Sequence, residues 1–176
     1  MFPNEHLERA SKALTLAKNA GMHIATAETV TAGLVSACLT SVSGASQVFE
    51  RGFVLYHDSA KATGLGVPEA ISQEHGAVSG PITQGLAEGA LKHSTAGVAV
   101  AVTGYAGPGG GNEKNPVGTV FVAAARRDRP TIVERHVFSG DRDAVRLAGV
   151  GAALDVLIKQ LTTLGFTEQG DLATPL

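Results

Sequence analysis

The chain has 176 residues, of which 44% are hydrophobic and 17% charged, and its formal net charge is −2. This length and composition predict a globular domain with a substantial core and exclude a disordered chain. The acidic balance, without a long lysine or arginine cluster, argues against a nucleic-acid partner. No apolar run reaches the ~18 residues of a membrane helix, so we expect no membrane partner. The single cysteine, Cys38, fits a reducing cytoplasm, where we expect the protein.

Helical spacing of apolar residues alternates with short apolar runs along the chain. We predict helices at 5–20, 31–39, 58–61, 68–73, 79–92 and 141–161, and strands at 22–27, 52–56, 98–103, 117–125 and 131–138. This alternation predicts a three-layer α/β/α fold with a mixed, mostly parallel sheet of about five strands. The last two strands are too close in sequence for a crossover and should form a hairpin. We expect a single domain over residues 1–164 and a flexible tail over residues 165–176.

The stretch from Val102 to Val120 lies between two predicted strands and is rich in glycine. Its glycines include Gly104, Gly107, Gly109, Gly110 and Gly111. Glycine accepts positive φ, and successive N–H groups in such a turn can form a concave anion site. The loop therefore predicts a phosphate or carboxylate site, with a long flexible hairpin connection as the alternative. Its spacing fits neither a Walker A motif nor a dinucleotide fingerprint.

A second candidate segment, Glu28 to Gly33, follows a predicted strand and leads into a predicted helix. The N–H groups at a helix start favour an anion or a developing oxyanion. A hydroxyl at Thr29 or Thr31 can serve there as a nucleophile. The alternative is that one of these threonines simply caps the helix.

A third segment places Tyr56 at a strand end and Lys61 on the next helical turn, where Asp58 is the predicted helix cap. Both side chains can reach one pocket, and either can take a proton from a hydroxyl. The alternative is an edge tyrosine and a solvated lysine. The 6 histidines are scattered without ligand spacing, so we expect no metal site.

Arg142 and Arg146 lie four residues apart at the start of the last predicted helix and should share a face. Paired arginines at a helix start suit a phosphate. Local ion pairing with Asp141 and Asp143 is the alternative.

Taken together, residues 7–161 resemble the C-terminal domain of the competence/damage-inducible protein A (CinA) family. The matching segments, in order, are Thr26-Ala27-Glu28, Thr31, Gly33-Leu34, Gly44-Ala45-Ser46, Arg51-Gly52-Phe53-Val54-Leu55-Tyr56, Ala60-Lys61, Leu65-Gly66-Val67, His75-Gly76-Ala77-Val78-Ser79, Ala101-Val102-Thr103-Gly104, Ala106-Gly107-Pro108-Gly109-Gly110-Gly111, Pro116-Val117-Gly118-Thr119-Val120 and Phe138 with Gly140-Asp141-Arg142. So many segments in one order make the resemblance specific.

The family includes nicotinamide mononucleotide deamidases. The resemblance implies hydrolysis of the carboxamide of this nucleotide, without metal or cofactor, to nicotinate mononucleotide and ammonia. It implies catalytic roles for Thr29, Tyr56 and Lys61, an oxyanion site at the N–H groups of residues 31–33, and a homodimer. The expected substrate-binding residues are Glu28, Thr31, Gly33, Thr103, Gly104, Gly107, Gly109, Gly110, Arg142 and Arg146.

The chain departs from the family pattern just after Glu28. The family reads serine, cysteine, threonine, glycine, glycine, whereas this chain has threonine, valine, threonine, alanine and glycine at 29–33. Thr29 replaces the expected serine nucleophile, and its methyl group stiffens χ1. Ala32 replaces a glycine and loses freedom for positive φ. The alternative function is therefore a catalytically silent paralogue that binds a nucleotide or a partner.

Overall fold

The computed structural model describes residues 1–162, so the tail predicted at 165–176 lies outside the described residues. The elements are α1 (Asn4–Asn19), β1 (Ile24–Glu28), α2 (Leu34–Thr40), the short 3-10 helix η1 (Ala45–Gln47), β2 (Phe49–Val54), α3 (Asp58–Leu65), α4 (Glu69–His75), α5 (Gly80–Lys92), β3 (Val98–Gly104), β4 (Thr119–Arg126), β5 (Arg129–Val137) and α6 (Arg142–Thr162). No helix within residues 1–162 is long and apolar enough to cross a membrane.

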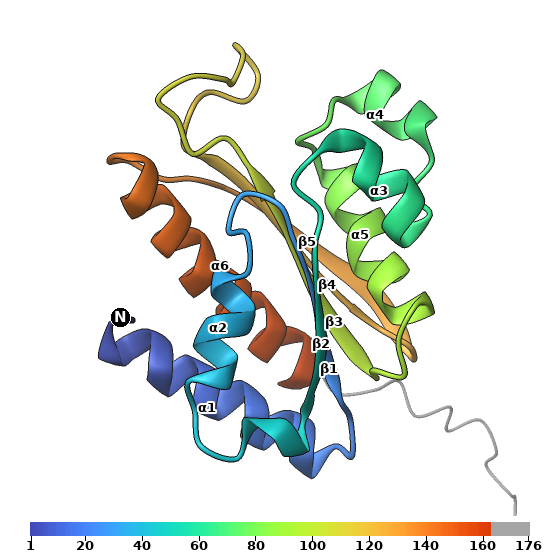
Figure 1. Cartoon of the computed structure of the whole chain (residues 1–176), viewed down its shortest axis with the longest axis vertical. Helices are drawn as coiled ribbons and strands as arrows, with labels where there is room; N and C mark the ends of the chain where they lie inside the picture. The colour runs from blue at the N-terminus through green and yellow to red at the C-terminus, as the bar shows by residue number, and fades with distance from the viewer. Residues whose placement is uncertain (163–176) are drawn as a thin grey trace, which may run out of the picture.

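Within the described residues, one five-stranded sheet has the order β2-β1-β3-β4-β5. β1 runs parallel to β2 and β3, whereas β4 runs antiparallel to both β3 and β5. Helices α1, α2 and α6 cover one face, and α3, α4 and α5 cover the other (Figure 1). The predicted three-layer α/β/α fold with a mixed, mostly parallel sheet is therefore confirmed. The predicted hairpin is the β4–β5 pair.

The two faces of the central strands carry different side chains. Val98, Val100 and Val102 of β3 belong to the core that α1 and α6 complete. Ala99 and Ala101, which alternate with them, belong to the core that α5 completes. Alternation along a strand sends successive side chains to opposite faces. The small alanines leave room for α5 to pack close to the sheet. Because both faces of β3 are covered, its sequence is a continuous apolar run.

Two helices begin at side-chain caps. The Ser79 hydroxyl caps α5, because it accepts a hydrogen bond from the Ile82 N–H at 3.4 Å. The predicted cap of α3 is wrong, because His57 Nδ1 accepts from the Ser59 N–H at 3.3 Å instead. Asp58 is already the first helical residue, and its carboxylate accepts from Lys61 Nζ at 2.8 Å instead.

The helix predicted from residue 31 begins only at Leu34. Residues 29–33 form a turn in which Ala32 has a φ of 49° and Gly33 a φ of 98°. Left-handed backbone at two successive residues cannot continue a right-handed helix. The turn therefore separates β1 from α2 and presents its own backbone at the end of the strand.

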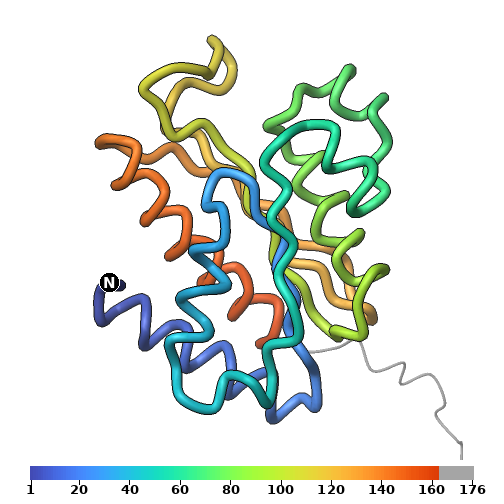
Figure 2. Tube along the Cα trace, in the orientation of Figure 1, coloured from blue at the N-terminus to red at the C-terminus, as the bar shows by residue number. Residues whose placement is uncertain are grey.

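The loops that follow β1, β2 and β3 gather at one edge of the sheet (Figure 2). Parallel strands bring their carboxyl ends to the same edge, which is where ligands bind in open α/β folds. All three candidate segments of the sequence lie in these loops. The fold thus places them together although they are far apart along the chain.

Candidate active site

A cleft of about 330 Å³ opens among these loops. It is lined by the predicted site residues Thr29, Tyr56, Lys61, Gly104, Gly107, Gly109 and Arg142. Its other lining residues are Val30, Asp58, Ala77, Val78, Tyr105 and Ala106, which the sequence did not single out as binding residues. Six predicted binding residues do not line it: Glu28, Thr31, Gly33, Thr103, Gly110 and Arg146.

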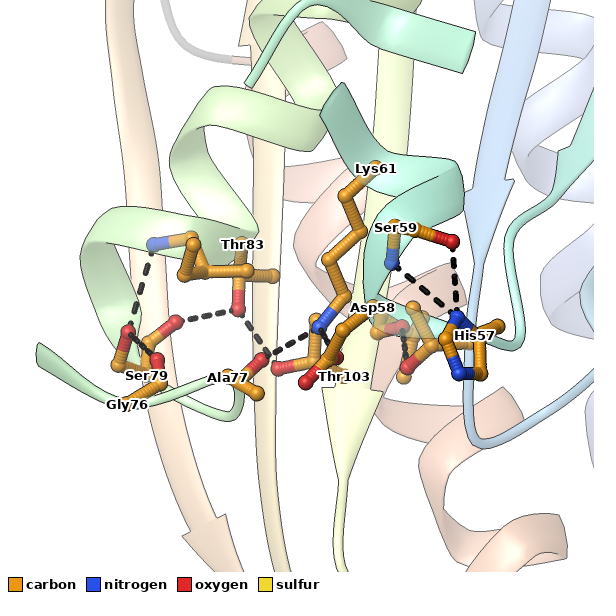
Figure 3. Close-up of polar contacts among 12 residues, drawn as sticks. His57, Asp58, Ser59, Lys61, Gly76, Ala77, Ser79, Thr83 and Thr103 are labelled. Atoms are coloured by element: carbon orange, nitrogen blue, oxygen red, sulfur yellow. Dashed lines mark hydrogen bonds and ion pairs between the residues drawn. The ribbon is translucent and has the colours of Figure 1, made fainter. Parts of the chain in front are cut away.

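Lys61 is buried beside the cleft, with only 7% of its side chain exposed. Its Nζ donates to Asp58 Oδ1 and to the Ala77 carbonyl, both at 2.8 Å (Figure 3). The solvated-lysine alternative is therefore wrong. These two bonds leave a third position on Nζ for the cleft, which is a donor in the ammonium form and a lone pair in the neutral amine. Asp58 was visible in the sequence three residues before Lys61, whereas the Ala77 carbonyl is a backbone group with no sequence signal.

Thr29 is the first residue of the turn at 29–33, and it is 8% exposed. Its hydroxyl donates to the Val102 carbonyl at 3.1 Å, and its own N–H donates to the same oxygen at 3.1 Å. The Thr29 hydroxyl thus rests against the end of β3. Before Oγ1 can pass its proton to a base, its O–H bond has to turn away from that carbonyl, while β-branching restricts where χ1 can place the oxygen.

Glu28 is fully buried and accepts five hydrogen bonds. Oε2 accepts from the Thr31 hydroxyl at 2.7 Å and from the N–H groups of Gly33 and Val35 at 2.9 and 3.0 Å. Oε1 accepts from the N–H and hydroxyl of Ser36 at 2.9 and 2.7 Å. The carboxylate therefore occupies the anion position at the start of α2. The side chains of Glu28 and Thr31 and the Gly33 N–H therefore bind one another within the turn instead of lining the cleft, and neither threonine caps the helix.

The N–H groups expected to form an oxyanion site in the same turn differ in whether they already have an acceptor. The Ala32 N–H donates to the Thr29 carbonyl at 3.1 Å, and the Gly33 N–H is bound by Glu28. Neither group is available to a substrate. Among the described residues, the N–H groups of Val30 and Thr31 have no acceptor. These two donors, directly after Thr29 in the chain, are the ones that a developing oxyanion can use.

Thr103 and Gly110 support the cleft from behind. The fully buried Thr103 hydroxyl lies 2.8 Å from the Thr83 hydroxyl, which donates to the Ser79 carbonyl at 2.7 Å (Figure 3). Thr103 therefore joins β3 to the start of α5 rather than facing substrate. A Cβ at Gly110 would lie 3.2 Å from Cδ1 of the Tyr105 ring, so this glycine leaves room for that ring.

The glycine-rich loop is tied down at its far end. The Asn112 N–H donates to the Asn115 carbonyl at 2.8 Å, and the Asn115 N–H donates to Asn112 Oδ1 at 2.8 Å. Arg135 of β5 donates to Asn115 Oδ1 at 3.1 Å and to the Lys114 carbonyl at 2.9 Å. These bonds attach the loop to the sheet and leave Gly104, Gly107 and Gly109 along the cleft, unlike an unattached flexible connection.

The two arginines of α6 have different surroundings. Arg142 lines the cleft, where it donates to the Gly107 carbonyl at 2.9 Å and to the Tyr56 hydroxyl at 2.8 Å. Arg146 lies behind the Thr29 turn and donates to the carbonyls of Val30 and Thr31 at 3.1 and 3.3 Å. Of the two predicted phosphate ligands, only Arg142 can therefore reach a molecule in the cleft. The alternative interpretation, local ion pairing, holds in part, because Arg146 Nη1 lies 3.8 Å from Asp143 Oδ1.

Other reactive groups lie away from the cleft. Burial raises the pKa of the Cys38 thiol to about 11, so at neutral pH it is a protonated core residue rather than a nucleophile. Within residues 1–162, no group of three or more histidine, cysteine, aspartate or glutamate side chains is arranged to hold a metal ion. The reactive side chains of the cleft are therefore hydroxyl, amine, carboxylate and guanidinium groups.

The family model of the CinA C-terminal domain matches residues 6–161. The chain belongs to the CinA C-terminal domain family. It is 43% identical over 160 residues to the nicotinamide-nucleotide amidohydrolase PncC of Escherichia coli K12, covering 91% of this chain and 97% of that protein. It is 52% identical over 122 residues to a CinA-like protein of Akkermansia muciniphila, covering 69% of this chain and 30% of that protein.

Among solved structures, the competence/damage inducible protein CihA of Agrobacterium tumefaciens superposes with a TM-score of 0.89 and 40% identity. The alignment covers 93% of this chain and 99% of that one. The fold and the CinA membership therefore agree. Within this CinA domain, the cleft at the strand ends is the candidate active site.

Proposed function

We propose that the protein is a nicotinamide-nucleotide amidohydrolase that converts nicotinamide mononucleotide to nicotinate mononucleotide and ammonia. The observation that carries the proposal is one cleft that joins Thr29, Tyr56 and Lys61 to a glycine loop and an arginine. The similarity to PncC over nearly its whole length supports it. The substrate has an amide at one end and a phosphate at the other, which matches a cleft with a hydroxyl–amine pair and a cationic group.

Thr29 is the proposed nucleophile. Its Oγ1 attacks the carboxamide carbon while the neutral Lys61 amine takes the hydroxyl proton, giving a tetrahedral intermediate bonded to Thr29. The N–H groups of Val30 and Thr31 stabilise the oxyanion. Lys61 then returns the proton to the leaving nitrogen, the carbon–nitrogen bond breaks, and ammonia departs. Water, deprotonated in the same way, releases nicotinate mononucleotide and restores the Thr29 hydroxyl.

Tyr56 assists at the other wall of the cleft. Its hydroxyl oxygen accepts from Arg142 at 2.8 Å, so its own proton remains free to donate to substrate. Asp58 and the Ala77 carbonyl act through Lys61, because they hold its Nζ beside the cleft. They are positioning groups in this scheme.

The phosphate of the nucleotide is assigned to Arg142 and the glycine loop. Arg142 uses two of its five N–H donors on Gly107 and Tyr56, which leaves donors for an anion. The backbone of Gly107 and Gly109 lines the same end of the cleft. A planar guanidinium suits bidentate contact with phosphate.

The deciding experiment measures ammonia release from nicotinamide mononucleotide by the native protein and by its Lys61→Ala variant. We expect release by the native protein and a loss of at least ~100-fold in kcat for the variant. Lys18→Ala is the matched control, since Lys18 lies on α1 and bonds only Gln47 among the described residues. Unchanged turnover in Lys61→Ala would refute the assigned role.

A silent nucleotide-binding module is the second candidate. The bond from the Thr29 hydroxyl to the Val102 carbonyl favours it, because it holds the nucleophile away from attack. Calorimetry separates the two functions: tight binding of nicotinamide mononucleotide without ammonia release supports the module, and absence of binding removes it. Ammonia release by the native chain removes it as well.

We further propose that the protein works in the cytoplasm as a homodimer. A free, buried cysteine suits a reducing compartment, and the family resemblance suggests the dimer. Light scattering coupled to gel filtration tests the dimer, and cell fractionation tests the compartment. A monomer at micromolar concentration would overturn the first, and recovery outside the cytoplasmic fraction the second.

A further inference from the structure

Arg142 and Arg146 lie one turn apart on α6, yet they serve different parts of the site. Arg142 borders the cleft, whereas Arg146 does not line it and donates to two carbonyls of the Thr29 turn. About a quarter of the Arg146 side chain is exposed, and its Nη1 lies 3.8 Å from Asp143. Its Nε and Nη2 are directed at the backbone of the Thr29 turn. Arg146 is thus a cation whose main partners are two carbonyl oxygens.

Because the peptide group is planar, a bond that fixes its C=O also fixes the direction of its N–H. In a trans peptide, the C=O and the following N–H point in opposite directions. Arg146 holds the Val30 carbonyl at 3.1 Å, so the N–H of Thr31 in the same peptide is turned away from Arg146. It likewise holds the Thr31 carbonyl at 3.3 Å, and the following N–H, that of Ala32, closes onto the Thr29 carbonyl. The guanidinium therefore sets the orientation of both peptides.

Glu28 completes the restraint from the other side of the turn. Its buried carboxylate holds the Thr31 hydroxyl at 2.7 Å and the Gly33 N–H at 2.9 Å. Thr31 is therefore bound through its side chain by an anion and through its carbonyl by a cation. Its own N–H is the one polar backbone group of this residue without a partner in the described residues. A restrained, unpaired donor beside a nucleophile is what an oxyanion site requires.

We propose that Arg146 is a positioning residue that acts through the Val30–Thr31 peptide and directs the Thr31 N–H at the oxyanion. The proposal rests on the proposed amidohydrolase function and deepens it. Hydrogen bonding at the carbonyl also polarises the peptide and strengthens its N–H as a donor. Arg146 then contributes to the chemical step for any carboxamide substrate and makes no contact with the phosphate, which is left to Arg142.

Paired variants of the two arginines test this division. Arg146→Met and Arg142→Met are compared for kcat, KM and the ratio of kcat/KM between nicotinamide mononucleotide and nicotinamide riboside, which lacks the phosphate. For Arg146→Met we expect kcat to fall roughly tenfold to a hundredfold with KM and the ratio unchanged. For Arg142→Met we expect KM to rise and the ratio to fall. Arg146→Lys, which keeps one donor, should recover part of the lost kcat.

Two results would overturn the proposal. A loss of phosphate preference in Arg146→Met would make Arg146 a substrate ligand, and an unchanged kcat would leave it without a role in the reaction. Thermal melting of both variants identifies a folding defect. If Arg146→Met does not fold, Arg146→Lys carries the same comparison.

A measurement without turnover separates this proposal from the proposed function. The amide resonance of Thr31 in a ¹⁵N-labelled sample should shift markedly in Arg146→Lys relative to the native protein, while that of the distant Thr131 on β5 should not. A native protein that releases no ammonia would end the amidohydrolase proposal, yet a shifted Thr31 resonance would still support the positioning of this peptide. An unshifted Thr31 resonance would overturn it whatever the activity.

Discussion

The Arg142 guanidinium bridges the cleft to Tyr56, with 2.8 Å between Nη2 and the phenolic oxygen. Its other branch reaches the Gly107 carbonyl at 2.9 Å. Because Tyr56 is 63% exposed, this bond is the contact that fixes its hydroxyl at the mouth. The bridge joins the loop after β2 to the loop after β3 through the start of α6. It explains how three segments distant in sequence form one wall.

Tyr56→Phe tests the role of this hydroxyl. The change keeps the ring and removes both the acceptor for Arg142 and the donor to substrate. We expect kcat for nicotinamide mononucleotide to fall by roughly tenfold or more. Tyr105→Phe is the matched comparison, since Tyr105 also lines the cleft but has no assigned hydroxyl role, and its effect should be smaller. Equal effects of the two changes on steady-state kcat would refute the assignment of Tyr56.

Thr29→Ser should raise turnover. Serine keeps the nucleophile, removes the methyl group and gains rotamers in which the hydroxyl can leave the Val102 carbonyl. Since a misplacement of ~1 Å can cost ~100-fold, we expect a gain between about tenfold and a hundredfold in kcat. Thr29→Val, which keeps the shape without the hydroxyl, should abolish ammonia release. Activity in Thr29→Val would show that Thr29 is not the nucleophile.

Glu28→Gln should destabilise the fold. Whichever carboxylate oxygen the amide nitrogen replaces, at least one backbone N–H among Gly33, Val35 and Ser36 loses its acceptor. We expect the free energy of unfolding to fall by roughly 2 to 3 kcal/mol. Urea denaturation measures it, with the exposed Glu8→Gln on α1 as the control. A loss no larger than that of the control would contradict this account of the turn.

Ala32→Gly should stabilise the protein. The φ of 49° at Ala32 lies in the left-handed region, where a Cβ costs about 1 kcal/mol or more. Removing the Cβ relieves that cost. Glycine also gives the unfolded chain more conformational freedom, which offsets part of the effect, so we expect the free energy of unfolding to rise by about 0.5 kcal/mol. Ala37→Gly, inside α2, should instead lose about 0.5 to 1 kcal/mol. Chemical denaturation of both variants checks the opposite signs.

Glu50→Gln should reveal a pH-dependent contribution. Partial burial alone raises the Glu50 pKa, but hydrogen bonds from the Thr95 hydroxyl and N–H, with the nearby Arg51 charge, bring it below its ordinary 4.5. A carboxyl group whose pKa is lower in the folded than in the unfolded state stabilises the fold at pH values above its unfolded pKa. This stabilisation is lost as the pH falls through the folded pKa. The variant should therefore cost on the order of 1 kcal/mol at pH 7 and less at pH 3. Equal costs in urea unfolding at both pH values would contradict this.

Much of the fold was readable from the sequence, whereas the site was readable only in part. The apolar runs at residues 98–102 and 117–125 predicted buried strands, and the structure has β3 and β4 there. The segments that hold Thr29, Tyr56 and Lys61 were recognised by their residue types after strands. Glu28 was expected to bind substrate because the sequence shows a carboxylate beside hydroxyls. Such a group can face a substrate or, as in the structure, the chain's own N–H groups.

By itself, the sequence determined the alternation of helices and strands, the family and the reactive residue types, because periodicity and motif are local properties of the chain. Only the tertiary structure decided what each side chain contacts. Lys61 finds the Ala77 carbonyl, and Arg146 finds the Val30 carbonyl 116 residues away. Arg142 and Arg146 are alike in sequence, yet one faces the cleft and the other the turn. Backbone carbonyls carry no residue-specific signal, so only the packing of α6 against the sheet could separate the two.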